Sequence, residues 1–331
     1  MLRERTAANP ERMQRALDGL RRYQEAERTA PPPPMPILAE TEGAMLRDYG
    51  GAGPPVVFVP SLINPPTILD LSEERSLLRW LAGQGHRVLL LDWGWPGDAR
   101  NSWSIADHVE RMLVPLLDSL GEPAALVGYC LGGTMAVAAA QLAAAGALAT
   151  IAAPWHFSAY PTDSREGLVR LWSEGGRDAA KALGVLPMEV LQSAFWSLDP
   201  ERTVAKFEAF AGMDSATAEA RAFVTLEDWA NDGPPIPGRA APDLFLEFFS
   251  ADTPGRGEWR VGGDCIRLER LELPALNMVS TTDRIVPAGA APRIGERIEL
   301  GQGHVGMVVG SNAREALWRP LADWLSRTAA K

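Results

Sequence analysis

The sequence predicts an α/β fold in which a mostly parallel sheet, covered by helices on both faces, is interrupted by an inserted helical cap. Three observations support this prediction. From about residue 55, short apolar runs alternate with helical patterns, which is typical of a parallel sheet with crossover helices. The alternation stops between residues 156 and 256, where aromatic and acidic residues follow helical patterns. It returns between residue 257 and the last residue.

The elements before the cap are four strands and three helices. Strands are expected at 56–59, 86–92, 124–127 and 147–153, and helices at 72–84, 104–119 and 133–145. The helix at 133–145 is almost entirely Ala, Met and Val, so it should be buried on most sides. Residues 7–28 predict a separate amphipathic helix, whose apolar side should dock on the body or on a partner. Pro31 to Pro34 end this helix and form a stiff linker.

The elements after the cap complete the sheet. A hairpin around Gly262 and Gly263 is expected at residues 259–266. Two strands are expected at 273–279 and 296–300, and the last helix at 312–327. We therefore divide the chain into an N-terminal helix with its linker (1–35), a first core part (36–155), the cap (156–256) and a second core part (257–331).

Composition excludes several classes of protein. A net charge of -10 argues against general nucleic-acid binding, which needs a basic face. Cys130 and Cys265 are the only cysteines and the four histidines are scattered, so neither a disulfide scaffold nor a structural metal site is expected. There is no apolar run long enough for a membrane span and no secretory signal, so we expect a cytoplasmic protein. We also expect no cofactor.

The motif with the clearest chemistry is Gly-Tyr-Cys-Leu-Gly at residues 128–132. A strand that ends in Gly-x-Cys-x-Gly and enters a helix of small residues matches the nucleophile elbow of the α/β-hydrolase fold, with cysteine in place of serine. Gly128 and Gly132 relieve the strained turn, and the helix N-terminus favours thiolate over thiol at Cys130. The alternative interpretation is a buried structural cysteine.

An acid and a base follow in the order that this fold requires. Asp283 comes after the strand at 273–279 and His304 after the strand at 296–300, so both lie beyond the carboxyl ends of strands. Taken singly, Asp283 could cap a turn and His304 could be an ordinary loop residue. Together with Cys130 they predict a catalytic triad. His156 is a weaker candidate because only its position, after the fourth strand, supports a chemical role.

Two backbone amides are expected to bind an oxyanion. The N–H of Leu131 follows the nucleophile directly, and the second donor should come from the loop after the first strand. We favour Leu62, with Ile63 as the neighbouring candidate, and expect Asn64 to brace the loop.

Several segments resemble polyhydroxyalkanoate synthases, in particular their short catalytic subunits that work with a second protein. The likeness covers roughly residues 55–328. The segments are Pro60–Asn64, Ile68–Leu71, Ser76–Leu81, Asp92–Gly94 with Pro96, Gly128–Thr134, Arg256–Gly263, Asp283–Pro287 and Gly303–Gly306.

The resemblance implies an acyltransferase with a Cys130-Asp283-His304 triad. Its substrates would be hydroxyacyl-CoA thioesters, whose acyl group passes to the cysteine and then to a hydroxyl of another hydroxyacyl unit. A second copy of the chain or a second synthase subunit is the candidate partner, and the surface of a polyester granule is a candidate location.

The chain also departs from the family pattern. Arg284 stands where the family usually has histidine, Trp155 and His156 replace its usual residues after strand four, and the cap matches weakly. The alternative function is therefore a thioesterase, an esterase or a polyester depolymerase with the same triad. A non-catalytic granule-associated protein is a third alternative. The elbow also resembles dienelactone hydrolases, which are shorter and lack a large insertion between nucleophile and acid.

Overall fold

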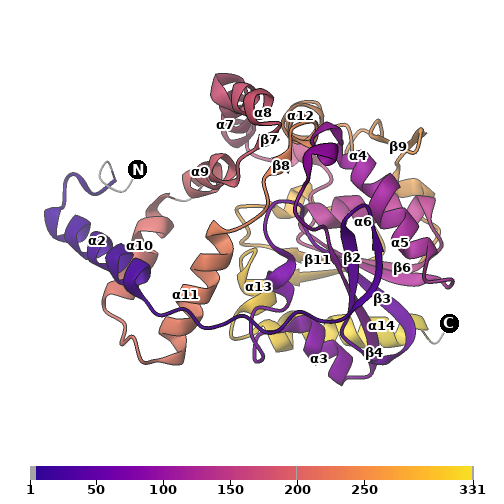
Figure 1. The fold of residues 1–331 in the computed structure, drawn as a ribbon, viewed down its shortest axis with the longest axis horizontal. Coiled ribbons are helices and arrows are strands. Elements are labelled where there is room, and N and C mark those ends of the chain that lie inside the picture. Colours follow the sequence, from indigo (N-terminus) through magenta and orange to yellow (C-terminus); the bar gives the residue numbers. More distant parts are fainter. Residues whose placement is uncertain (1–4, 199, 330–331) are drawn as a thin grey trace.

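The computed structural model describes residues 5–198 and 200–329, and its centre is an eight-stranded sheet (Figure 1). The strand order is β1-β2-β4-β3-β5-β6-β11-β12. The three strands at one edge pair antiparallel, and all pairs from β4 to β12 are parallel. The strands are β1 (Ile37–Thr41), β2 (Ala44–Asp48), β3 (Ala52–Val59), β4 (His86–Asp92), β5 (Ala124–Tyr129), β6 (Ala145–Ile151), β11 (Ala275–Ser280) and β12 (Glu296–Leu300).

Helices cover both faces of the sheet because the side chains of each strand alternate between two apolar clusters. Val57 and Leu89 face one cluster, and their neighbours Phe58 and Val88 face the other. The first face is covered by α4 (Ile105–His108), η3 (Val109–Leu113), α5 (Val114–Asp118) and α6 (Leu131–Leu142). The second is covered by α3 (Leu77–Gly83), α13 (Gly306–Val309), η9 (Arg314–Trp318) and α14 (Arg319–Ala329) (Figure 1).

The segment between β6 and β9 (Arg260–Val261) is mostly helical, as the sequence predicts for the cap. Its helices are η4 (Phe157–Ala159), α7 (Thr162–Leu171), η5 (Trp172–Gly176), α8 (Arg177–Leu183), α9 (Met188–Leu198), α10 (Pro200–Ala211), α11 (Ala218–Asn231), α12 (Ala240–Pro242) and η6 (Asp243–Ser250). A two-residue strand pair joins β7 (Val185–Leu186) to β8 (Ile236–Pro237). The domain boundaries at residues 35, 155 and 256 stay predictions.

The N-terminal helix α2 (Pro10–Glu25) docks on the cap rather than on the sheet (Figure 1). Arg12 forms ion pairs with Glu201 and Glu208 of α10, both at 2.9 Å. Gly19 permits the close approach of the two helices, since a Cβ there would overlap the carbonyl oxygen of Phe207. The sequence predicts the apolar face of α2, but only the structure identifies the surface that it contacts.

Several helices begin or end at residues other than those predicted, and two of these differences have a local cause. The helix expected at 72–84 begins only at Leu77, because the Ser76 hydroxyl accepts a hydrogen bond from the Arg79 N–H (3.0 Å) and caps it there. The helix expected at 133–145 is α6, which starts at Leu131 and ends at Leu142, so that β6 can begin at Ala145. Strands β1 and β2 are further additions, because their sequence lacks a clear apolar alternation.

The remaining short elements connect the larger ones. The predicted hairpin is present as β9 (Arg260–Val261) and β10 (Asp264–Cys265), with positive φ at Gly262 and Gly263. The 3₁₀ turns outside the cap are η1 (Pro66–Leu69), η2 (Asp98–Ser102), η7 (Leu268–Arg270) and η8 (Ala288–Ala290). Among the described residues no helix is long and apolar enough to cross a bilayer.

Candidate active site

Cys130 sits in a strained turn between β5 and α6. Its φ of 54° lies in the left-handed region that non-glycine residues rarely occupy. The flanking glycines make this turn possible, since a Cβ at Gly128 would overlap Gly133 and a Cβ at Gly132 would overlap the carbonyl oxygens of Val59 and Pro60. The backbone thus has the geometry that the elbow motif predicts, and it presents Cys130 at the first turn of α6.

Asp283 and His304 meet at the carboxyl ends of β11 and β12. His304 Nδ1 lies 2.6 Å from Asp283 Oδ2, and both residues are only 8% exposed. The other carboxylate oxygen, Oδ1, accepts hydrogen bonds from the N–H groups of Ile285 (2.7 Å) and Val286 (3.1 Å). These three bonds fix the carboxylate and leave Nε2 of the imidazole as the nitrogen available for the nucleophile.

The electrostatics of His304 favour the imidazolium. Burial by itself lowers its pKa, but the charges of Asp283 and Cys130 and hydrogen bonds to both side chains outweigh it and raise the pKa from 6.5 to about 10. The ring of Tyr129 stacks obliquely on the imidazole, with centroids 5.1 Å apart. An imidazolium beside Cys130 stabilises negative charge on the sulfur, so the three side chains form a connected unit.

The loop after β3 contains the two candidates for the second oxyanion donor. The N–H of Ile63 donates to the Ser61 hydroxyl (3.1 Å), whereas the N–H of Leu62 has no hydrogen-bond partner among the described residues. Ile63 lines both cavities at Cys130 and Leu62 lines neither, so Leu62 as the second donor stays a prediction. Asn64 donates to the carbonyl oxygen of Asp232 in the cap (3.3 Å), which is the bracing role expected for it.

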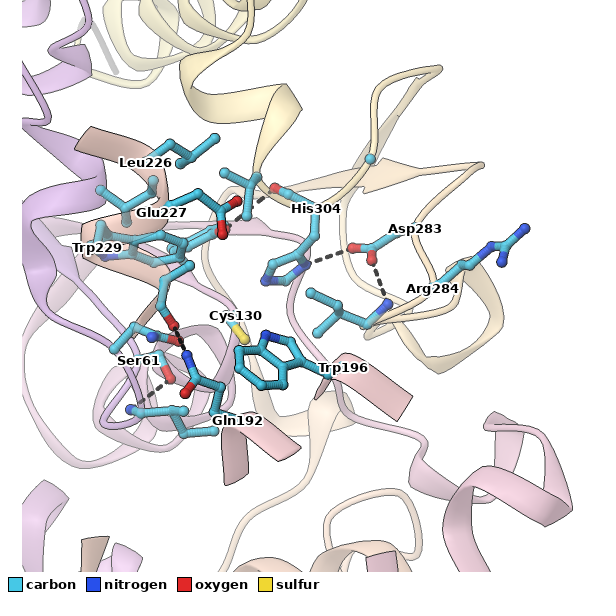
Figure 2. A pocket seen from close by; sticks show the side chains of 18 of the residues that line it. Ser61, Cys130, Gln192, Trp196, Leu226, Glu227, Trp229, Asp283, Arg284 and His304 are labelled. Atoms are coloured by element: carbon cyan, nitrogen blue, oxygen red, sulfur yellow. Dashed lines mark hydrogen bonds and ion pairs between the residues drawn. The ribbon is translucent and has the colours of Figure 1, made fainter. Parts of the chain in front are cut away.

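Cys130 opens onto a wide cavity of about 280 Å³ between the core and the cap. Figure 2 shows His304 and the indole of Trp196 on either side of the cysteine sulfur. Three cationic side chains, Arg202, Lys206 and Arg284, also line this cavity. In the view of Figure 2 the Arg284 side chain points away from Cys130.

A second cavity of about 60 Å³ also reaches Cys130 and lies beneath the cap. Its lining is almost entirely apolar. The sequence analysis did not identify its cap residues, since their helical pattern resembles any packed helix. Their signal was only the richness of residues 156–256 in aromatic side chains.

The other sequence candidates lie away from the chemistry. His156 lines neither of the two cavities at Cys130. His108 is buried between Trp93 and Trp103, and burial lowers its pKa to about 4. Among the residues described, no group of three His, Cys, Asp or Glu side chains could hold a metal ion.

Curated relatives of this chain are named poly(3-hydroxyalkanoate) polymerase subunit PhaC. The protein of Haloarcula marismortui is 29% identical over 87% of this chain and 64% of its own length. That of Haloferax mediterranei is 30% identical over 82% of this chain and 58% of its own length. The protein of Thiocystis violacea is 26% identical over 82% of this chain and 80% of its own length. The chain thus spans about three fifths of the haloarchaeal relatives, and its resemblance to polyhydroxyalkanoate synthases is confirmed.

Solved structures and a family model agree on the fold. A monoacylglycerol lipase from Paleococcus ferrophilus has a TM-score of 0.54 at 16% identity and covers 88% of this chain and 100% of its own. An esterase from Thermogutta terrifontis has a TM-score of 0.51 at 16% identity, and the match covers 91% of this chain and 100% of the esterase chain. Both support the fold alone. The model of the alpha/beta hydrolase family matches residues 56–318, and this chain therefore belongs to the alpha/beta hydrolase family.

Proposed function

We propose that this protein is an acyltransferase of the polyhydroxyalkanoate-synthase type, which moves hydroxyacyl groups from CoA thioesters through an acyl-enzyme on Cys130. The observation that carries the proposal is a cysteine, rather than a serine, at a strained elbow beside the buried His304–Asp283 pair. Exchange between two thioesters is nearly thermoneutral because one thiolate leaves as another attacks. The names of the curated relatives support the same chemistry.

In the first step the Cys130 thiolate attacks the carbonyl carbon of the thioester. The tetrahedral oxyanion accepts hydrogen bonds from the N–H groups of Leu131 and Leu62. The bond to the CoA sulfur then breaks, and the proton of the His304 imidazolium passes to the departing thiolate. The products are an acyl-cysteine, free CoA and a neutral His304.

In the second step neutral His304 acts as the base. It removes the proton from the hydroxyl of another hydroxyacyl unit, whose oxygen attacks the acyl-cysteine carbonyl. The oxyanion forms between the same two amides, and Cys130 leaves as a thiolate. Asp283 holds the imidazole so that Nε2 faces the reacting atoms, and His304 is an imidazolium again at the end of the cycle.

The wide cavity supports a CoA thioester as the substrate. CoA is a polyanion, and the cap side of the cavity contains the guanidinium of Arg202 although the chain has a net charge of -10. The ammonium of Lys206 also lies there but is paired with the Glu227 carboxylate at 2.7 Å, so Arg202 is the cation that would attract phosphates. The proposed chemistry uses only side chains and amides of this chain, and the absence of a cofactor stays a prediction. A partner subunit or second copy, and a location at a granule surface, stay predictions.

The test follows CoA release and polymer formation from 3-hydroxybutyryl-CoA. We expect both with the unmodified chain and neither with Cys130→Ala. A Cys265→Ala variant is the matched control, because Cys265 lines neither cavity at Cys130. Release of free hydroxyacid without polymer would show that the protein is a thioesterase rather than a synthase. Activity on simple esters alone would show that it is an esterase. Unchanged CoA release by Cys130→Ala would contradict the assignment of Cys130 as the nucleophile.

A further inference from the structure

The small cavity at Cys130 is bounded mainly by the cap. Leu168 of α7, Leu191 of α9 and Phe245 and Phe249 of η6 form its apolar wall. Cys130, Ile63 and Ile285 line both cavities, so the two meet at the nucleophile. A thioester carbonyl bound at Cys130 therefore has two spaces beside it. The wide one is mostly apolar but contains the cationic side chains of Arg202 and Lys206, whereas the small one has almost no polar lining.

The volume of the small cavity limits what can occupy it. This cavity has about 60 Å³, against about 280 Å³ for the wide cavity. Beyond its carbonyl carbon, a 3-hydroxybutyryl group has two chain carbons, a methyl and a hydroxyl. A 3-hydroxyhexanoyl group is two carbons longer and needs more of this limited space.

The small cavity also contains a hydroxyl suited to such a group. Tyr160 lines it and is only 7% exposed. Its ring is fixed between Phe157, stacked at 5.9 Å, and Phe249, edge-on at 5.1 Å. Within residues 5–198 and 200–329 the Tyr160 hydroxyl has no hydrogen-bond partner, and it is not completely enclosed. Burial, with the nearby charges of Cys130 and Asp283, raises its pKa, so the hydroxyl keeps its proton.

We propose that the small cavity is the subsite for the hydroxyacyl group, that its apolar walls disfavour groups longer than 3-hydroxybutyryl, and that the Tyr160 hydroxyl hydrogen-bonds the hydroxyl of the substrate. The inference rests on the proposed function and adds its substrate class. Tyr160 then determines specificity without taking part in bond making. A buried hydroxyl without another partner binds a substrate hydroxyl and disfavours an analogue that lacks one.

The first experiment compares 3-hydroxybutyryl-CoA with butyryl-CoA, which differ only in this hydroxyl. Butyryl-CoA has no hydroxyl to accept the acyl group, so the two thioesters are compared in the CoA burst of a single turnover. We expect Tyr160→Phe to lower the rate constant for acylation of Cys130 by the hydroxyacyl thioester on the order of 10-fold, and to leave that for the butyryl thioester unchanged. Butyryl-CoA thus serves as an internal control for folding. An equal loss on both thioesters, or no loss on either, would overturn the role of Tyr160.

The second experiment changes the size of the cavity. Leu168→Ala should raise the ratio of kcat/KM for 3-hydroxyhexanoyl-CoA over 3-hydroxybutyryl-CoA on the order of 10-fold, the discrimination that an apolar pocket gives per methylene. Leu171→Ala is the matched control, since Leu171 is also half-buried on α7 but lines neither cavity. An unchanged ratio in Leu168→Ala, or the same rise in Leu171→Ala, would place the acyl group elsewhere.

The two proposals fail in different ways. If the unmodified chain releases CoA but the ratios do not respond to Tyr160→Phe and Leu168→Ala, the subsite is wrong and the proposed function stands. If it releases CoA from no thioester, the proposed function is wrong. The subsite is then tested with 4-nitrophenyl 3-hydroxybutyrate against 4-nitrophenyl butyrate, where the same change of ratio is expected and its absence contradicts the inference.

Discussion

Replacing Asp283 by Asn tests the triad most directly. The carboxylate oxygen Oδ1 is held by the N–H groups of Ile285 and Val286, so the amide oxygen of Asn would keep these bonds. The NH₂ group would then face Nδ1 of His304 and force the proton onto Nε2. A histidine in that tautomer cannot accept a proton from a hydroxyl, although the packing of the site is unchanged.

The size of the effect follows from the pKa of His304. The rise from 6.5 to about 10 corresponds to on the order of 5 kcal/mol in favour of the imidazolium. Asp283 provides the largest part of the attraction that outweighs burial. Without this charge we expect the pKa to fall toward neutral values and kcat to fall on the order of 10³- to 10⁴-fold, as in other triads whose aspartate is replaced by an amide.

Two measurements check this prediction. CoA release from 3-hydroxybutyryl-CoA gives kcat, and the imidazole proton resonances give the pKa of His304, assigned by comparison with His304→Gln. Asp70→Asn is the control, because it removes a buried carboxylate that pairs with Arg79 (2.7 Å) and lines neither cavity at Cys130. A loss of kcat below 10-fold in Asp283→Asn, or an unchanged pKa of His304, would refute the reasoning.

Three further predictions concern stability. Because the folded-state pKa of His304 lies above 6.5, its contribution to the free energy of unfolding is complete below pH 6.5. This contribution declines as the pH rises above 6.5 and is lost beyond about pH 10, and melting measured at several pH values should show the decline. Gly19→Ala should detach α2 from the cap and lower the melting temperature, because its Cβ would overlap Phe207, whereas Gly167→Ala on an open helix face should not. Lys206→Met should destabilise by about 3 kcal/mol, since it leaves the buried Glu227 carboxylate without its 2.7 Å partner, and adding Glu227→Gln should restore most of the loss in denaturant unfolding. Equal melting of both glycine variants, or no recovery in the double variant, would contradict the last two.

Local sequence was sufficient for the parallel strands from β3 to β12 and for the order of the site residues, but not for β1 and β2. A short apolar run predicts β4 to the residue, because central strands of a parallel sheet are buried on both faces. The predicted bounds of β12 are also those observed, although it is a largely exposed edge strand. The frame around Cys130 is equally local, since it depends on contacts between neighbouring glycines and adjacent backbone. The helix at 72–84 was less accurate, because the Ser76 cap competes with a pattern that could begin earlier.

The sequence by itself determined the α/β fold, the elbow at Cys130 and the candidacy of Asp283 and His304. Tertiary structure alone decided that these two residues lie 2.6 Å apart and that α2 packs on the cap. It also showed that the Ser61 hydroxyl accepts from the N–H of Ile63, a contact that the local sequence does not predict. The small cavity has the same origin: its walls come from segments far apart in the chain, and their separation is set by packing rather than by any local pattern.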